Sequence, residues 1–249
     1  MNKIEFLQFE NLEIKVERKP HRRSVTILLA PKKPIIVRAG LKTPPSFILN
    51  FIKSKQSWIE KNLEKFKQIE NLFPEKKIKE AEIFPFRGLE RQLKVVITPG
   101  KKYFVSLVES HLLLHVPINE WNALSKQIEY ENQLHALRAF YKREAMSYLS
   151  ERIAHWAREM NLFPSMVKFR EQKKRWGSCS ARKVINLNWK LILFSDEVID
   201  YVLIHELAHL RHLDHSADFW NLVQSYCPQY KKQNQILKNT QALTDFLNE

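Results

Sequence analysis

The chain has 249 residues, 44% hydrophobic and 11% aromatic, which excludes a disordered protein and suffices for one large domain or two modest ones. Lys and Arg number 41 against 27 Asp and Glu, a formal net charge of +14. The first residues lack the pattern of a secretory signal, and no apolar run reaches the length of a membrane span, so we expect a cytoplasmic protein without membrane contact. Cys179 and Cys227 lie far apart and predict neither a disulfide framework nor a cysteine metal site.

The positive charge is concentrated in the first half of the chain. Residues 1–118 hold 23 Lys and Arg against 12 Asp and Glu, whereas residues 119–249 hold 18 against 15. A basic half could attract nucleic acid or an acidic partner, but a well-solvated, lysine-rich surface explains the same composition. Both interpretations stay open at this point.

Short β-branched segments bounded by Pro, Lys or Gly dominate the first 118 residues and predict strands. They are Leu12–Val16, Ser24–Leu29, Pro34–Arg38, Gln92–Thr98 and Tyr103–Val116, the last with a turn at Ser110-His111. From Pro45 to Lys67, apolar residues recur at three- and four-residue steps and predict one amphipathic helix. The charged, proline-bracketed residues 70–85 are typical of a linker. We therefore expect residues 1–118 to form a basic, β-rich module with one helix packed on it.

Residues 119–249 predict a second domain, richer in helix. The stretch from Trp121 to Met160 is dominated by Ala, Leu, Glu, Arg and Lys and lacks Gly and Pro, which predicts one or two long helices. Val167–Arg170 and Val184–Phe194 are apolar and β-branched, so we expect strands there. The expected fold class is α+β.

One motif in this second half carries metal chemistry. Ser195-Asp196-Glu197 supplies a capping hydroxyl and two acids for the start of a helix that contains His205, Glu206 and His209 as His-Glu-x-x-His. The two histidines lie one turn apart, so both imidazoles can reach one cation, and Glu206 beside them can take a proton from zinc-bound water. Histidines falling on one helix face by chance would give the same pattern, but the cap and the further histidines argue against chance. We predict one Zn²⁺ per chain, with Glu206 as the general base.

The third ligand has two histidine candidates, His212 and His215. On an unbroken helix His212 would lie roughly 10 Å along the axis from His205, too far to close one zinc shell. If the helix ends near Leu213-Asp214, the chain can return His215 to the metal, at the interval of the metzincin pattern H-E-x-x-H-x-x-G-x-x-H. We predict His215 as the third ligand. The other candidate donors are the carboxylates of Asp214, Asp218 and Glu197.

The metal motif and several segments around it form one recognisable pattern. They are Arg175–Ser180 (RWGSCS), Leu187–Trp189, Glu197–Val202, His205–Leu210, His215-Ser216 and Phe219-Trp220, with His21–Val25 and Ser54–Ile59 nearer the start. In these residues the chain resembles the YgjP-like family of zincin-type metallopeptidases. The resemblance implies a zincin-like metallohydrolase domain over residues 119–249, with an active-site helix, a mixed or antiparallel sheet and a three-histidine zinc site. The resemblance also implies a distant relation to SprT-like proteases, which act on DNA-bound proteins. This relation is consistent with a nucleic-acid partner for the basic half but does not establish one.

Three functions are consistent with these observations. The first is cleavage of a peptide or protein substrate, with the substrate strand along Val184–Leu193 and with Arg175 and Asn188 as substrate-binding residues. The second keeps the metal centre but hydrolyses a nucleotide phosphoanhydride, although the chain lacks a Gly-rich phosphate loop. The third is a nucleic-acid-associated protease whose basic module binds with strongly salt-dependent affinity. Within the RWGSCS segment, Gly177 predicts a turn or a close backbone approach, and Cys179 a buried inert thiol.

Overall fold

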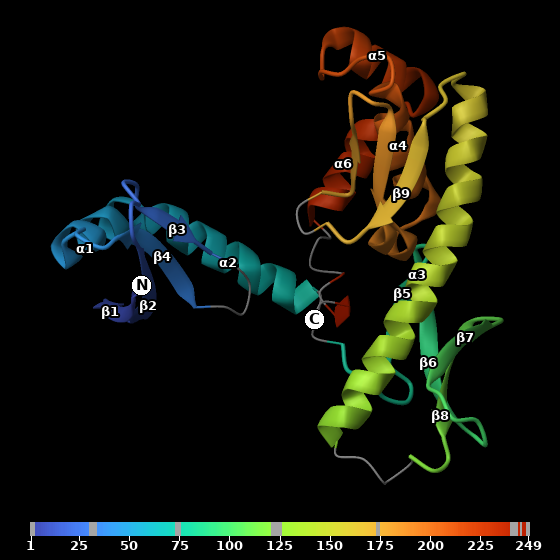
Figure 1. The fold of residues 1–249 in the computed structure, drawn as a ribbon, viewed down its shortest axis with the longest axis horizontal. Coiled ribbons are helices and arrows are strands. Elements are labelled where there is room, and N and C mark those ends of the chain that lie inside the picture. Colours follow the sequence, from blue (N-terminus) through green and yellow to red (C-terminus); the bar gives the residue numbers. More distant parts are fainter. Residues whose placement is uncertain are drawn as a thin grey trace. The chain divides into compact units, whose positions relative to one another are not determined.

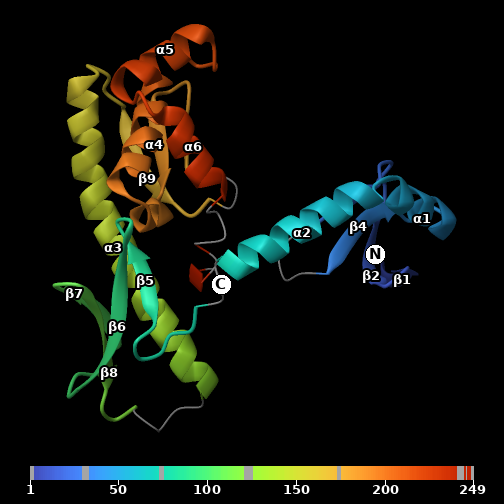
Figure 2. The same cartoon turned by 180° about the vertical axis from the view of Figure 1, so that it is seen from behind.

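The computed structural model describes residues 3–29, 34–72, 76–120, 126–172, 175–239, 244 and 246–247. They form an α+β fold, as expected, in two compact units that comprise Met1–Glu75 and Lys76–Glu249 (Figures 1 and 2). Within the described ranges, no helix is both long and apolar enough to span a membrane.

The first unit is a four-stranded sheet with two helices. Its elements are β1 (Lys3–Phe9), β2 (Leu12–Lys19), β3 (Thr26–Leu28), β4 (Ile35–Gly40), α1 (Pro45–Ser54) and α2 (Gln56–Leu72). The strand order is β1-β2-β4-β3, with β2 and β4 parallel and the two outer pairs antiparallel. Alternate residues of β2 and β4, such as Ile14 and Val37, are buried in one core with Ile48, Ile52 and Ile59 from the helices. This core confirms the expected packing of helix on sheet.

Two details of the first unit differ from expectation. The single helix predicted from Pro45 to Lys67 is two helices, because Lys55 leaves the helical conformation at φ −112° and ψ 9° and its N–H closes α1 on the Ile52 carbonyl. Strand β1 was not predicted, although polar and apolar residues alternate over its first four residues. In the structure none of its side chains is fully buried and Ile4 and Phe6 are exposed, so backbone pairing with β2 defines this strand more than burial of one face does.

The second unit contains two further sheets and the longest helix. Its elements are β5 (Ile83–Phe86), β6 (Leu89–Thr98), β7 (Phe104–Val108), β8 (His111–Pro117), α3 (Lys126–Glu159), β9 (Met166–Arg170), β10 (Gly177–Cys179), β11 (Val184–Asn188), the 3-10 helix η1 (Trp189–Leu193), α4 (Asp196–Ala208), α5 (Ala217–Tyr226) and α6 (Tyr230–Asn239). One sheet has the order β5-β6-β8-β7 and the other β10-β11-β9. Helix α3 runs beside the first of these sheets at one end and beside α4 at the other (Figure 1).

The two four-stranded sheets share one topology. In each, a hairpin is followed by two strands of which the later one pairs in parallel with the second strand of the hairpin, and the intervening strand lies at the edge. Each sheet is also followed by a helix that packs on it. The sequences of the two segments show no evident repeat. The same topology can be reached with different apolar residues, as long as each sheet buries one face.

The division between the units lies at residues 75 and 76 and not at the expected residue 118. The sheet of β5 to β8 buries Phe84, Leu93 and Leu114 in the same core as α3 and α4. The β5–β6 turn also donates backbone hydrogen bonds from Arg87 to the Ile192 carbonyl at 2.8 Å and from Gly88 to the Leu193 carbonyl at 3.2 Å. A sequence pattern reports strands but not the core in which they are buried, so the β-rich stretch was assigned to one module.

The strand expected over Val184–Phe194 ends early. Strand β11 stops at Asn188, whose side-chain oxygen accepts a hydrogen bond from the Lys190 N–H at 3.1 Å and starts the 3-10 helix. All five residues of η1 are buried, which explains why the apolar run continues without a change of pattern. Short apolar runs do not distinguish a buried strand from a buried helical turn.

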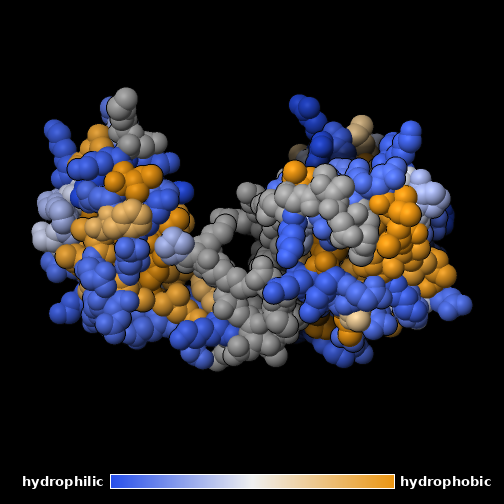
Figure 3. Space-filling view, turned by 90° about the horizontal axis from the view of Figure 1, so that it is seen from below, coloured by the Kyte–Doolittle hydropathy of each residue, from blue (hydrophilic) through white to orange (hydrophobic). Residues whose placement is uncertain are grey.

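Both units carry apolar side chains on their surfaces. In the first unit the large exposed ones include Phe6, Phe47 and Trp58, and in the second they include Phe104 and Phe163. Figure 3 shows hydrophobic residues in orange on the surface, between hydrophilic residues in blue. Exposed apolar residues of this kind are ordinary on a soluble surface and assign no function by themselves.

The assignment of residues 76–118 to the second unit predicts how a core substitution spreads. Leu114→Ala removes a side chain that is 1% exposed and should cost about 2–5 kcal/mol of unfolding free energy. Hydrogen exchange followed by mass spectrometry should then show faster exchange of the α4 amides, because β8 and α4 share one core.

Ile52→Ala is the matched control in the core of the first unit. It should accelerate exchange in residues 3–72 and leave α4 unchanged. Faster α4 exchange after Ile52→Ala, or none after Leu114→Ala, would contradict the division at residues 75 and 76.

Candidate metal centre

Helix α4 presents the candidate metal ligands from inside the second unit. Nine of its 13 residues are buried, so the helix is apolar on nearly all sides and packs against α3, α5, α6 and β10. Ser195 precedes it as the N-cap residue, as expected, but its hydroxyl makes no capping bond to the helix backbone. A hydrogen bond with Ser195 instead lowers the pKa of the Glu197 carboxyl.

Two acidic residues attach α4 to its surroundings. Asp200 accepts hydrogen bonds from Nε and Nη2 on one edge of the Arg152 guanidinium, at 2.6 and 2.5 Å, and from the Trp156 indole N–H at 2.8 Å. Asp196 accepts two from Arg87, at 3.1 and 2.6 Å, and this pairing lowers the pKa of the Asp196 carboxyl. Two-point arginine bonds fix orientation as well as distance. They therefore hold α4 in rotation and position against α3 and the β5–β6 turn.

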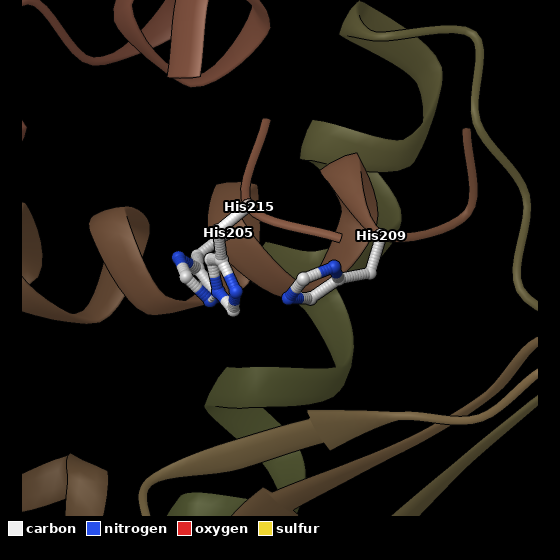
Figure 4. Close-up of side chains that lie close together, drawn as sticks. All are labelled: His205, His209 and His215. Carbon is white, nitrogen blue, oxygen red and sulfur yellow. Dashed lines mark hydrogen bonds between the residues drawn. The ribbon is translucent and has the colours of Figure 1, made fainter. Parts of the chain in front are cut away.

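His205, His209 and His215 converge, as expected from the sequence. One ring nitrogen from each of the three residues lies within 4.8 Å of the other two. The Nε2 atoms of His205 and His215 are 3.2 Å apart. Figure 4 shows the His209 ring directed toward the other two rings. Two imidazoles on one tetrahedral zinc ion, with bonds of about 2.0–2.1 Å, place their nitrogens about 3.3 Å apart, so the spacing fits a shared cation.

A reversal of the chain brings His215 to this position. Helix α4 ends at Ala208, and the following turn is closed by bonds from the Leu210 and His212 N–H groups to the Leu207 and Ala208 carbonyls, at 2.9 and 3.0 Å. The reversal comes a few residues before the predicted Leu213-Asp214. It leaves the His212 side chain outside the histidine group, whereas Phe219 of α5 packs against all three rings of the group.

His212 contributes through its backbone. Its carbonyl lies 3.0 Å from Nδ1 of His209 and can only accept, so Nδ1 carries the proton and Nε2 keeps its lone pair for a metal. Such a bond on the far nitrogen is the usual way in which a ligand imidazole is oriented. In contrast, Nδ1 of His205 is buried and has no hydrogen-bond partner within the described ranges.

Burial disfavours the charged form of His205 and His209. The pKa of His205 falls to about 3, mainly through desolvation and further through His209 and His215. Burial also lowers the pKa of His209. Because only the neutral ring can bind a metal, the site is prepared for a cation at neutral pH. The residues present therefore fit a divalent metal, and in the described part of the chain no carboxylate joins the group, neither Asp214, Asp218 nor Glu197.

Glu206 lies on the same helix, 5% exposed, against strand β10. Its Oε2 atom has no hydrogen-bond partner among the described residues. Desolvation raises the pKa of the carboxyl to about 8, with Arg175 opposing the shift. A buried acceptor with a raised pKa is suited to take up a proton, and a cation held by the histidines would lower that pKa again.

Gly177 permits the approach of Glu206 to β10. A Cβ atom at this position would lie 2.5 Å from Oε1 and 2.7 Å from Cδ of Glu206. The close backbone approach expected from the glycine is therefore confirmed, and its partner is the carboxylate. Cys179 follows on the same strand, and burial together with the Glu206 charge raises the pKa of its thiol to about 11, which agrees with an inert cysteine.

The two predicted substrate-binding residues differ in their exposure and contacts. Arg175 is exposed beside the site, and its role stays a prediction. Asn188 is 3% exposed and donates to the carbonyls of Gln172 and Arg175, at 2.9 and 3.3 Å, in addition to accepting from Lys190. Its polar atoms are thus engaged with the chain itself, and it shapes the segment before β10 instead of facing a substrate.

Strand β11 is also unavailable to a substrate strand. It pairs with β10 on one side and β9 on the other, so the expected pairing along Val184–Leu193 conflicts with the sheet order. Strand β10 lies at the edge of this sheet and contains Gly177, which contacts Glu206. The sequence pattern singled out β11 because β11 is apolar, and it missed the edge position of β10 because β10 has only three residues.

Some of the positive charges of the first unit form structural ion pairs and hydrogen bonds. Arg18 is 4% exposed and bonds to Glu5 at 2.8 Å and to the Thr43 carbonyl at 2.6 Å. Arg38 pairs with Glu17 at 2.8 Å. Binding of nucleic acid by the remaining charges stays a prediction.

The buried helix, the three converging imidazoles and the adjacent carboxylate define a metallohydrolase centre of the His-Glu-x-x-His type. The chain belongs to the YgjP-like family, because the model of the YgjP-like metallopeptidase domain matches residues 23–240. This membership makes the protein a metal-dependent peptidase whose substrates are peptides or proteins. No curated protein matched the chain.

Similar solved structures are two archaeal metallopeptidase zymogens. Abylysin of Pyrococcus abyssi is 26% identical, with a TM-score of 0.35, and the match covers 37% of this chain and 95% of abylysin. Jannalysin of Methanocaldococcus jannaschii is 23% identical, with a TM-score of 0.32, and the match covers 36% of this chain and 96% of jannalysin.

The ligand geometry predicts different outcomes for the two neighbouring histidines. His215→Ala removes one of three converging nitrogens and should lower bound metal from about one ion per chain to well below half after dialysis, because three protein ligands are the usual minimum. His212→Ala keeps the carbonyl that holds His209 and should retain the metal. Plasma emission spectrometry of the purified variants measures both, and metal loss in His212→Ala alone would overturn the assignment.

Gly177→Ala tests the contact between β10 and Glu206. The added methyl would overlap the carboxylate and displace it, and misplacement by about 1 Å can cost roughly a hundredfold in rate. Metal content should be unchanged. Gly100→Ala is the matched control, since a Cβ there meets only Thr98 Oγ1 at an ordinary 3.6 Å. Full casein-cleaving activity in Gly177→Ala would show that the glycine does not serve Glu206.

Proposed function

We propose that the protein is a zinc metallopeptidase in which His205, His209 and His215 hold the metal and Glu206 is the general base. The observation that carries this proposal is the convergence of three imidazoles beside a buried carboxylate with a free oxygen. Zinc is favoured over harder cations because imidazole nitrogens are the whole donor set, whereas Mg²⁺ and Ca²⁺ prefer oxygen ligands. When bound, zinc would polarise the scissile carbonyl and lower the pKa of water to about 7.

Glu206 supplies the proton transfers of the reaction. Its free Oε2 accepts a proton from the attacking water, and the same carboxyl then donates that proton to the departing amine. Burial raises the pKa of this carboxyl to about 8 in the absence of a metal, and the charge of a bound cation would lower that pKa so that the ionised carboxylate is available as a base at neutral pH. Burial among α4, β10 and the surrounding core keeps bulk water from competing for the carboxylate.

Strand β10 supports an extended substrate. As an edge strand it can pair with a peptide through backbone hydrogen bonds, which are independent of the peptide's sequence. Gly177 would then place the peptide backbone next to Glu206. We propose this edge, and not β11, as the position of the substrate strand, with exposed Arg175 beside its start.

The role of Glu206 has a direct test. Glu206→Gln keeps the shape of the side chain but cannot accept a proton, so cleavage of casein by the zinc-loaded protein should fall by about 10²–10⁴-fold. Bound zinc should remain near the wild-type level, because Glu206 is not among the converging ligands.

Glu197→Gln is the matched control, an exposed glutamate at the other end of the same helix. It should retain activity. Equal cleavage by wild type and Glu206→Gln would remove Glu206 from the mechanism, and loss of zinc with loss of activity would instead make it a ligand.

A further inference from the structure

A cavity of about 320 Å³ opens beside the candidate metal centre, and the reaction proposed above does not say what fills it. It lies between α4, α6 and the start of β10, and His205 and Glu206 form part of its wall. This volume is at the lower end of the range for small-ligand pockets, about 300–1,000 Å³. It therefore suits one substrate side chain or one chain end next to the reacting bond.

The walls of the cavity are mostly apolar. Trp176, Tyr201, Val202 and Leu237 line it. Tyr201 is 5% exposed. The pKa of its hydroxyl is raised to about 12, mainly by burial, so the side chain stays uncharged. An apolar lining binds methylene groups and leaves discrimination to the few polar groups present.

Two polar side chains of α6 complete the lining. Asn234 and Lys238 are four residues apart, so they lie on one face of the helix. Neither has a side-chain hydrogen bond or ion pair to any residue in the described ranges. Among the described residues, Lys238 is the only Lys or Arg that lines the cavity and Glu206 the only acid. The lining thus offers an unpaired ammonium and an amide donor on α6, whereas its carboxylate comes from α4.

We propose that this cavity binds a carboxylate of the substrate adjacent to the scissile bond, with Lys238 and Asn234 as the residues that select it. The proposal rests on the peptidase function proposed above and names the class of substrate. The carboxylate is either an Asp or Glu side chain or the free C-terminus of the peptide. A basic side chain would meet the Lys238 ammonium, and a purely apolar one would leave both polar groups of α6 without a partner.

The acidic residue of the lining supports the same choice. Because Glu206 of α4 also lines the cavity, a substrate carboxylate is best placed at Lys238 and Asn234 of α6. A substrate group with methylenes along Trp176 and Leu237 and its charge at Lys238 matches both the apolar and the polar parts of the lining. An ammonium ion near an otherwise apolar wall binds a carboxylate as a compact point charge.

The test compares peptides that differ at one position. Quenched fluorescent peptides carry Glu, Gln or Lys on either side of one cleavable bond, each with a free or an amidated C-terminus. They are assayed with zinc-loaded wild type, Lys238→Glu and Lys232→Glu, the last a matched charge reversal on α6 outside the cavity. Affinity for each peptide is measured in parallel by fluorescence anisotropy with a chelator present, so that no hydrolysis is needed.

We expect wild type and Lys232→Glu to prefer a carboxylate-bearing peptide over its uncharged counterpart by about tenfold in kcat/KM and in affinity. Lys238→Glu should lose this preference and favour Lys. Dependence on the Glu side chain identifies a side-chain carboxylate, whereas dependence on the unblocked end identifies the C-terminus.

The same ranking of peptides in all three proteins would overturn the proposal, even if every peptide is cleaved. A carboxylate preference in affinity that depends on Lys238, without cleavage of any peptide, would support the cavity and contradict the peptidase function. The two proposals can therefore fail separately.

Discussion

The burial of helix α4 is the constraint on which the second unit depends. Its apolar residues pack on nearly every side, and Asp196 and Asp200 join it through arginine pairs to the β5–β6 turn and to α3. The helix can neither rotate nor slide without breaking these contacts. His205, Glu206 and His209 are consequently held in place before any metal or substrate arrives, and preorganisation of this kind lowers the cost of binding both.

The same burial sets the electrostatics of the centre. Desolvation disfavours charge, so the pKa of His205 is lowered and that of Glu206 is raised. The neutral rings of His205 and His209 and the protonatable carboxyl of Glu206 provide what a cation and a proton transfer require. Gly177 belongs to this arrangement, because only a residue without a side chain lets β10 approach the carboxylate.

Local patterns in the sequence were sufficient for the parts of the centre that lie within one turn of helix. The spacing of His205 and His209 and the intervening Glu206 follow from helical geometry alone, and the three-histidine group was anticipated once a chain reversal was assumed. Features that depend on packing between distant segments were beyond such patterns. Three such features are the core to which the β5–β8 sheet belongs, the edge position of β10, and the cavity that Lys238 lines together with residues of α4. Each depends on contacts between elements far apart in the chain, so no local sequence pattern predicts it.

The central claim is that three imidazoles and no other protein group hold a zinc ion. X-ray absorption at the zinc edge of the zinc-loaded protein tests this most directly, because it counts and identifies the ligand atoms. We expect three imidazole nitrogens and one further light atom at about 2.0–2.1 Å. A sulfur ligand at about 2.3 Å, or only two imidazoles, would contradict it.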